Sequence, residues 1–384
     1  MKIERISVRV FTHNTRKHKD IDGHTHPGPP VQTRSAVLTL QADNGLEGHA
    51  IGAPDLVRPE LLNAYVRPTL LQQDPLQREA LWRKLAHWQR GSGGNWHDRA
   101  LALVDCALWD LNGQLLGVPV WKLAGGCRDR LPAYASTMCG DDIPGGLATP
   151  EDYARFALQL QARGYQAIKL HTWMPPIAGA PSVKMDIAAC AAVREAVGPA
   201  MPLMLDANHW YSRQEALELG RALEKLGYTW LEEPMEESSP ASYRWLAGQL
   251  DIAVCGPETA WGKHHMRAEW AASAACDILR TGVHDVGGIT PALKCMHLAE
   301  SFNIDCEVHG TGLANLAVSA ACGNSRWYER GLLHPHLDYD QPPEYLQRLS
   351  DPMDAQGFVH LPTTPGLGEA IDWSWVEAHT VEQH

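Results

Sequence analysis

The sequence lacks a long apolar run, a paired cysteine motif and an excess of positive charge, and each absence excludes a class of protein. No apolar stretch approaches the ~20 residues that a membrane helix needs. The N-terminus, MKIERISVRVF, alternates like a strand and has no continuous apolar core of the kind found in signal peptides. We therefore expect neither a membrane span nor a secretory leader.

Cysteine usage and charge narrow the class further. The nine cysteines are scattered and form no C-x-x-C pair, which argues against a disulfide framework or a structural zinc site and favours the reducing cytoplasm. The formal net charge of -12 argues against a nucleic-acid partner bound through a broad basic face. We predict a cytoplasmic globular protein, and 384 residues suit two domains better than one.

The first part of the chain is typical of a small α+β domain. Residues 3–11 and 36–43 alternate like antiparallel strands, and residues 58–117 are helical in pattern until Gly117 and Pro119. The polar stretch 13–33 between the strands predicts a long loop or a functional lid. Its four histidines have no clean ligand spacing, so we favour solvated side chains over a metal site: His13, His18, His24 and His26.

From Leu131 the chain alternates between short apolar strands and helices. Thr149 and Pro150 begin one helix, and Ser212 with Glu215 forms a capping box for another. Eight such strands predict an α/β fold with a parallel barrel. We expect the strands at 131–137, 166–172, 202–206, 228–233, 252–258, 276–282, 304–309 and 326–329.

Three carboxylates stand at the ends of three consecutive predicted strands. They are Asp206, Glu232 and Glu258, and chemistry in parallel barrels takes place where the strands end. Converging carboxylates repel one another, and a hard cation such as Mg²⁺ relieves that repulsion with oxygen ligands alone. Helix capping or pairing with a nearby base explains any one of these carboxylates, but poorly explains all three in a row.

Basic side chains flank this predicted metal site. Lys169 and His171 lie two residues apart on one strand and so share a face, and His309 ends the seventh strand. A substrate carboxylate bound to the metal would have these basic groups on opposite sides. One group could remove the proton from the carbon next to that carboxylate, and the other could transfer a second proton. Lys169 and His171 both remain candidates for the base.

Several motifs, in order along nearly the whole chain, resemble the enolase superfamily in its mandelate racemase-like subgroup. They are VDCALWDLNGQLLGVPVWKLAGG, LDAN, WLEEP, GPE, DVGGIT, EVHGTGLANL and PGLG. The resemblance implies a modified (β/α)₇β barrel at residues 129–360, an α+β capping domain at 1–128 and a C-terminal return at 361–384. It implies Mg²⁺ on Asp206, Glu232 and Glu258, and it matches Glu329 to a glutamate that hydrogen-bonds the substrate carboxylate. Relatives of this type usually assemble, so we expect a homo-oligomer between a dimer and an octamer.

The sequence departs from the subgroup at two positions. The second strand usually carries Lys-x-Lys, and here it carries Lys169-x-His171. The Asp that usually orients the seventh-strand histidine is replaced by Gly282, and Asp285 and His284 are out of register. We therefore expect His309 to lack this orienting carboxylate, which argues against a racemase with two matched bases. The alternatives are that His309 finds another partner or still acts as a general acid.

The resulting prediction is a Mg²⁺-dependent sugar-acid dehydratase. It would remove the α-proton of an aldonate or aldarate, stabilise the enediolate on Mg²⁺ and eliminate the β-hydroxyl to give a 2-keto-3-deoxy acid. Alternatives are an epimerase, racemase or cycloisomerase of a sugar acid or lactone, and an inactive relic that binds a sugar acid. The polar stretch suits a polyhydroxylated acid, through residues that include Asn14, Arg16, Lys19 and Asp22. Candidate substrate contacts are His24, His26, Asn208, Arg280 and Trp173, with a core contact as the alternative for Trp173.

Overall fold

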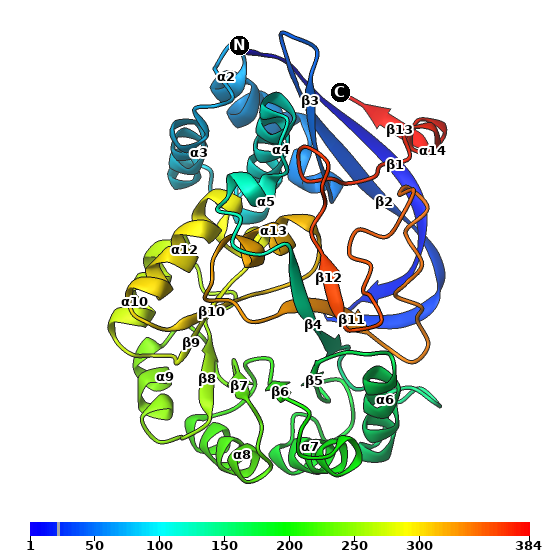
Figure 1. Ribbon diagram of the computed structural model, residues 1–384, viewed down its shortest axis with the longest axis vertical. Helices are drawn as coiled ribbons and strands as arrows, with labels where there is room; N and C mark the ends of the chain where they lie inside the picture. Colours follow the sequence, from blue (N-terminus) through cyan, green and yellow to red (C-terminus); the bar gives the residue numbers. More distant parts are fainter. Residues whose placement is uncertain (21–23) are drawn as a thin grey trace.

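The computed structural model describes residues 1–20 and 24–384, which form an antiparallel sheet and a parallel barrel (Figure 1). The antiparallel sheet has the order β13-β1-β2-β3 and combines the two ends of the chain. Its strands are β1 (Ile3–Lys19), β2 (Thr25–Ala42), β3 (Glu47–Gly52) and β13 (Thr380–Gln383). The helices beside it are α1 (Pro59–Leu61), α2 (Arg67–Leu70), α3 (Arg78–His87), α4 (Asp98–Leu116) and α5 (Val120–Leu123), with short 3₁₀ or π turns η1 (Pro54–Val57), η2 (Leu62–Val66) and η3 (Trp88–Gly91).

The barrel strands follow one another in the order β10-β9-β8-β7-β6-β5-β4-β11, and each neighbouring pair is parallel. This confirms the predicted α/β barrel. The strands are β4 (Arg130–Thr137), β5 (Ala167–His171), β6 (Leu203–Asp206), β7 (Trp230–Glu232), β8 (Ala253–Gly256), β9 (Ile278–Thr281), β10 (Asp305–Val308) and β11 (Tyr328–Leu333). The helices are α6 (Pro150–Ala162), α7 (Val183–Val197), α8 (Arg213–Lys225), α9 (Pro240–Ala247), α10 (Lys263–Ala272), α11 (Val283–Val286), α12 (Ile289–Ser301) and α13 (Leu313–Ala321).

The gap between β10 and β11 is bridged mainly by one buried side chain. Glu307 accepts hydrogen bonds from the backbone N–H groups of Arg326 (2.7 Å) and Trp327 (3.3 Å), and the N–H of Cys306 donates to the carbonyl of Asn324 (2.7 Å). Burial raises the pKa of Glu307 to about 7, against these hydrogen bonds, which lower it. The side chain thus supplies acceptors for backbone donors that a strand ladder would otherwise satisfy.

The predicted helix starts are confirmed by their caps. The hydroxyl of Thr149 accepts from the N–H of Asp152 at the start of α6, and Ser212 and Glu215 form the reciprocal capping box of α8. Each cap satisfies N–H groups of its own helix that would otherwise be unpaired. Because the cap and these N–H groups are close in the sequence, the sequence alone predicts where such a helix begins.

Within the polar stretch 13–33, residues 13–19 and 25–33 form strands rather than the predicted loop. Strands β1 and β2 stay paired from Ile3–Ala42 at one end to Lys19–Thr25 at the other, with register shifts near both ends. We call the distal part of this hairpin, residues 13–20 and 24–33, the arm. A two-stranded ribbon alone is marginally stable in water. The arm is also held by the neighbouring segment, because Asn14 N–H donates to Glu344 (3.0 Å) and the His13 ring packs against Tyr345. Asp22 lies outside the described residues. Strand β3 was also not predicted.

Buried carboxylates on α4 join the two parts of the molecule. Asp105 accepts hydrogen bonds from both the N–H (2.9 Å) and the hydroxyl (2.8 Å) of Thr290 at the start of α12. Asp110 accepts from the N–H groups of His49 (2.7 Å) and Leu367 (2.6 Å), which ties β3 to the C-terminal segment. A Cβ on Gly288 would lie 2.3 Å from an oxygen of Asp105, so this close approach requires glycine.

The C-terminal segment returns to the antiparallel sheet, as the sequence predicts. Strand β12 (Phe358–His360) pairs antiparallel with β4, helix α14 (Trp373–Ala378) follows, and β13 then pairs with β1 (Figure 1). Within residues 1–20 and 24–384, every helix is too short or too polar to span a lipid bilayer.

Candidate active site

A cavity of about 360 Å³ opens at the carboxyl ends of the barrel strands, under the arm. Its floor is formed by side chains at the strand ends, and its roof is formed by Lys17, His24 and Thr25 of the arm. The strand register aligns the floor, because His171 lies beside Asp206 and Asp206 beside Glu232. The floor residues include Lys169, His171, Asp206, Glu258, His309 and Glu329.

The three predicted metal ligands converge. Asp206, Glu232 and Glu258 each offer a carboxylate oxygen, and these oxygens lie within 4.8 Å of one another. Burial raises the pKa of Glu232, although Arg280 and Lys169 oppose this shift. A buried, all-oxygen set of this kind fits a hard divalent cation such as Mg²⁺.

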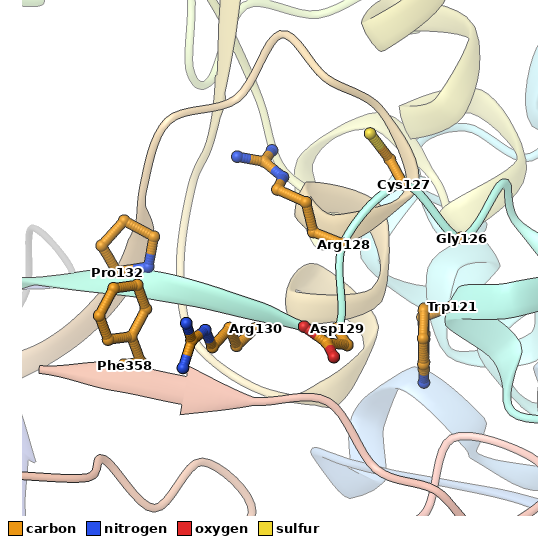
Figure 2. Close-up of a pocket in the computed structure, with 8 residues that line it drawn as sticks. All are labelled: Trp121, Gly126, Cys127, Arg128, Asp129, Arg130, Pro132 and Phe358. Atoms are coloured by element: carbon orange, nitrogen blue, oxygen red, sulfur yellow. The ribbon is translucent and has the colours of Figure 1, made fainter. Parts of the chain in front are cut away.

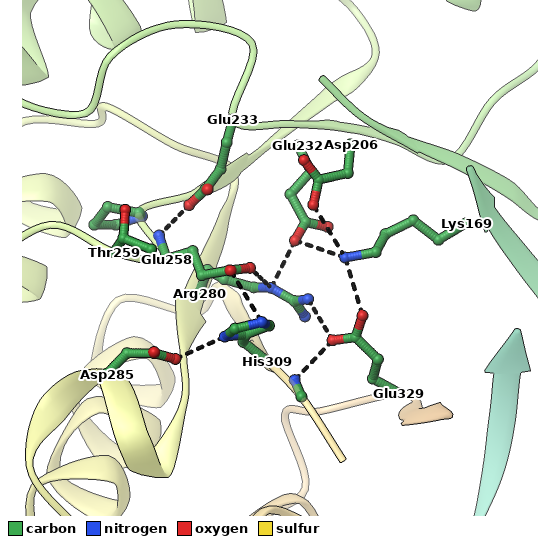
Figure 3. A network of polar contacts seen from close by, with 12 residues as sticks. Lys169, Asp206, Glu232, Glu233, Glu258, Thr259, Arg280, Asp285, His309 and Glu329 are labelled. Atoms are coloured by element: carbon green, nitrogen blue, oxygen red, sulfur yellow. Dashed lines mark hydrogen bonds and ion pairs between the residues drawn. The ribbon is translucent and has the colours of Figure 1, made fainter. Parts of the chain in front are cut away.

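Lys169 lies among the carboxylates of this site (Figure 3). Its ammonium is 2.9 Å from Glu232 Oε1 and 3.2 Å from Glu329 Oε1, with Asp206 Oδ2 at 3.3 Å. Burial alone would lower the pKa of Lys169, but Glu232 and Glu329 raise it well above its usual range. The side chain is therefore a buried cation that balances the acidic cluster.

His171 faces the same cluster with one ring nitrogen only. Its Nε2 lies 3.1 Å from Asp206 Oδ2, whereas its buried Nδ1 has no hydrogen-bond partner among the described residues. Both Lys169 and His171 line the cavity, as their spacing on one strand predicts.

His309 has an orienting carboxylate, and the expectation that it lacks one was wrong. Its Nδ1–H donates to Asp285 Oδ2 (2.7 Å), and its Nε2 lies 3.0 Å from Glu258 Oε1 (Figure 3). A Cβ on Gly282 would lie 2.1 Å from Asp285 Oδ2. Asp285 thus reaches back across the short helix α11 and fills the space that a side chain at position 282 would need. Burial alone would lower the pKa of His309, but Glu258 and Asp285 raise it well above its usual range.

Arg280 does not line the cavity, so the structure does not support the expected substrate contact. The side chain is fully buried behind the floor, with Nε 2.8 Å from Glu232 Oε1 and Nη2 2.8 Å from Glu329 Oε2. Glu329 also accepts the N–H of Gly310 (2.8 Å). The cations around Glu329 hold its pKa well below the usual range, against burial, which raises it.

The remaining substrate candidates divide between the cavity and its surroundings. Asn208 and His24 line the cavity, as expected. His26 lies outside its lining and contacts Asp20 (2.8 Å). Trp173 is buried in the core, where its ring packs edge-on against Tyr153 at 5.2 Å between centroids, so its alternative as a core residue is the one observed.

Among the lining residues that sequence reasoning did not select, two lie in contact with each other beside the acidic cluster. They are His209 and Glu233, whose Nε2 and Oε2 lie 3.2 Å apart. Both have positive φ, +66° and +43°, and so does Asn208 at +50°. Strained backbone of this kind gathers at functional sites, but the sequence gives no sign of it.

A second cavity, of about 530 Å³, lies near the start of β4, whereas the first cavity lies at the carboxyl ends of the strands (Figure 2). Its two arginines are already engaged. Arg128 donates to the carbonyls of Ser319 (3.1 Å) and Cys322 (3.0 Å), and Arg130 stacks over Phe358 at 4.6 Å. It brings together no acid–base pair like those at the carboxyl ends, so we place the chemistry at the carboxyl ends of the strands.

Two family models match the chain. "Mandelate racemase / muconate lactonizing enzyme, N-terminal domain" matches residues 6–125, and "Enolase C-terminal domain-like" matches residues 152–375.

Curated relatives match over most of their length. The arabinonate dehydratase of Saccharolobus solfataricus is 31% identical over 367 residues, which cover 90% of this chain and 89% of the relative. The D-galactarolactone cycloisomerase of Agrobacterium fabrum is 32% identical over 352 residues and 88% of each chain. A crystal structure of D-glucarate dehydratase from Agrobacterium tumefaciens, complexed with magnesium, is 60% identical and has a TM-score of 0.98 over all of both chains.

Proposed function

Because the chain belongs to the enolase superfamily, in its mandelate racemase-like subgroup, we propose that it is a Mg²⁺-dependent dehydratase of a sugar acid. The reaction converts an aldonate or aldarate into a 2-keto-3-deoxy acid and water. The observation that carries the proposal is the placement of three converging carboxylates between Lys169 and His171 on one side and the His309–Asp285 pair on the other. The similarity to dehydratases, one of them crystallised with magnesium, supports it.

Asp206, Glu232 and Glu258 would hold the Mg²⁺. When bound there, the ion supplies positive charge that offsets the negative charge developing on the substrate carboxylate as the α-proton leaves.

His171 is the residue that we assign to take the α-proton. Lys169 is held as an ammonium by three carboxylates, and an ammonium has no lone pair with which to accept a proton. His171 lies at the same edge of the cavity, and its Nε2 contacts a carboxylate of the acidic cluster, Asp206, at 3.1 Å. Lys169 then acts as a fixed positive charge beside the substrate carboxylate.

His309 is the residue that we assign to protonate the departing β-hydroxyl. Asp285 fixes the ring with a proton on Nδ1, and the carboxylates on both sides favour the charged imidazolium. Loss of the α-proton and departure of the hydroxyl as water give an enol, which tautomerises to the keto acid.

The hydrogen bond from Glu329 to a substrate carboxylate would need a proton on Glu329. Because Lys169 and Arg280 keep Glu329 ionised, we propose that it positions these two cations instead.

Isomerisation is the second candidate, and one observation favours it. The His309–Asp285 pair provides the oriented histidine that a two-base racemase or epimerase requires, which removes the argument against that reaction. A curated relative is a cycloisomerase.

A panel of aldonic and aldaric acids with Mg²⁺ separates the candidates. Formation of a 2-keto-3-deoxy acid supports dehydration, whereas a change of optical rotation without keto acid supports isomerisation. Ligand-induced stabilisation without any product supports an inactive binding protein. We also propose a homo-oligomer, between a dimer and an octamer, which light scattering on the purified protein measures.

A further inference from the structure

We propose that Lys17 of the arm binds a second carboxylate of the substrate, so that the preferred substrate is a sugar diacid (an aldarate) rather than an aldonate. This inference rests on the proposed dehydration at the same site. It concerns the roof of the cavity, which takes no part in the proton transfers assigned to the floor.

Lys17 is a cation in the cavity lining without a paired carboxylate. The other lysine of the lining, Lys169, contacts three carboxylates. Within residues 1–20 and 24–384, Lys17 forms no ion pair, and its ammonium lies 5.1 Å from the centre of the Tyr339 ring. The carboxylate behind that ring, Asp351, accepts the hydroxyls of Tyr328 (2.8 Å) and Tyr339 (3.1 Å). Lys17 therefore keeps its donors for a group inside the cavity.

The other roof side chains also suit an anion. Thr25 offers a hydroxyl and His24 an imidazole beside Lys17 in the cavity lining. His24 and His26 both lie close to Asp20, with Nδ1 of His24 at 3.4 Å and Nε2 of His26 at 2.8 Å from its Oδ2. Asp20 therefore offers a carboxylate to both imidazoles. Lys17 has no such contact among the described residues; burial lowers its pKa, and the more distant charge of Asp351 opposes that shift.

The two ends of the cavity therefore match the two ends of an aldarate. At the floor, the Mg²⁺ proposed on the protein carboxylates would bind the substrate carboxylate next to the reacting carbon. At the roof, the ammonium of Lys17 faces the far end of the substrate. An aldarate carries a second carboxylate there, and an aldonate carries a neutral hydroxymethyl group. A charge-assisted hydrogen bond to Lys17 forms only with the diacid.

The test compares Lys17→Met with wild type on an aldarate and on the aldonate of the same configuration. Lys17→Arg retains the charge. Lys19→Met makes the same chemical change two residues away on the same strand. The structure places this exposed lysine outside the cavity lining, so it does not support the substrate contact that the sequence suggested for Lys19. The measured quantity is kcat/KM for keto-acid formation with Mg²⁺, and circular dichroism melting checks that each variant is folded.

We expect wild type to prefer the aldarate, and Lys17→Met to lower kcat/KM for the aldarate by about 10- to 100-fold. The aldonate rate should change by less than about threefold, Lys17→Arg should retain part of the preference, and Lys19→Met should behave as wild type. An equal loss on both acids, or no loss on the aldarate, overturns the role of Lys17. If wild type converts neither acid, the dehydratase proposal fails. The role of Lys17 is then tested by calorimetric binding of the aldarate and the aldonate to wild type and to Lys17→Met. Tighter binding of the aldarate that is lost in Lys17→Met supports its role, and equal binding of both acids overturns it.

Discussion

Replacing Asp285 with Asn tests the division of labour between the two sides of the cavity. The bond from His309 Nδ1–H to Asp285 Oδ2 is 2.7 Å long, and the Asp285 side chain is 6% exposed. Such a charge-assisted bond contributes about 1.5–3 kcal/mol, or roughly 10- to 150-fold in rate. An amide can also donate to Nδ1 and so favour the wrong tautomer, and general acid catalysis is worth about 10²–10⁴-fold in total. We expect kcat for dehydration to fall by about 10²- to 10³-fold.

The pH profile supplies an independent readout of the same variant. Burial lowers the pKa of His309, while Glu258 and Asp285 raise it. Removing the charge of Asp285 therefore lowers that pKa. Because His309 acts as an acid only when protonated, the fall of activity at high pH should begin at a lower pH in Asp285→Asn.

The assay measures keto-acid formation across pH and, in D₂O, exchange of the substrate α-proton by mass spectrometry. Exchange should survive in Asp285→Asn, because His171 removes that proton from the other side. The paired change Gly282→Asp with Asp285→Gly moves the carboxylate three residues back along the chain, to a position whose side chain would point at the space that Asp285 now fills, and should recover part of the activity. If Asp285→Asn keeps more than half of the dehydration rate, or loses exchange in parallel with it, the assignment of His309 is wrong.

Three other predictions concern the metal, the base and the junction. Glu232→Gln should abolish both calorimetric Mg²⁺ binding and activity, and an active, EDTA-resistant variant would refute the ligand assignment. His171→Asn should stop α-proton exchange while Mg²⁺ binding persists; exchange at the wild-type rate would instead point to another base. Burial raises the pKa of Asp105 to about 7 from 3.8. The folded state therefore binds the proton more tightly, and the Asp105 contribution to stability falls by about 3 kcal/mol as pH rises from 4 to 7. Melting temperatures of Asp105→Asn should therefore fall less than those of wild type between pH 5 and 8; equal falls would show that Asp105 does not titrate in this range.

The barrel and the acidic cluster follow from local signals in the sequence. Short apolar strands and capped helices are local signals, because strand length, helix caps and periodicity depend on neighbouring residues. Once the parallel barrel is recognised, its geometry brings the strand ends to one face, so Asp206, Glu232 and Glu258 converge without further information.

The completion of this cluster depends on contacts that form in three dimensions. Asp285 reaches His309 because α11 turns back over the empty side of Gly282, and strand spacing along the sequence does not record that approach. Arg280 lies one residue before the end of β9 yet is buried behind the floor, where three glutamates surround its guanidinium. The polar sequence of the arm predicts a loop, whereas the structure pairs its strands. Backbone hydrogen bonds make this pairing, and they leave no hydrophobic pattern in the sequence. Its pairing is what carries Lys17, distant in sequence from every floor residue, into the lining of the same cavity.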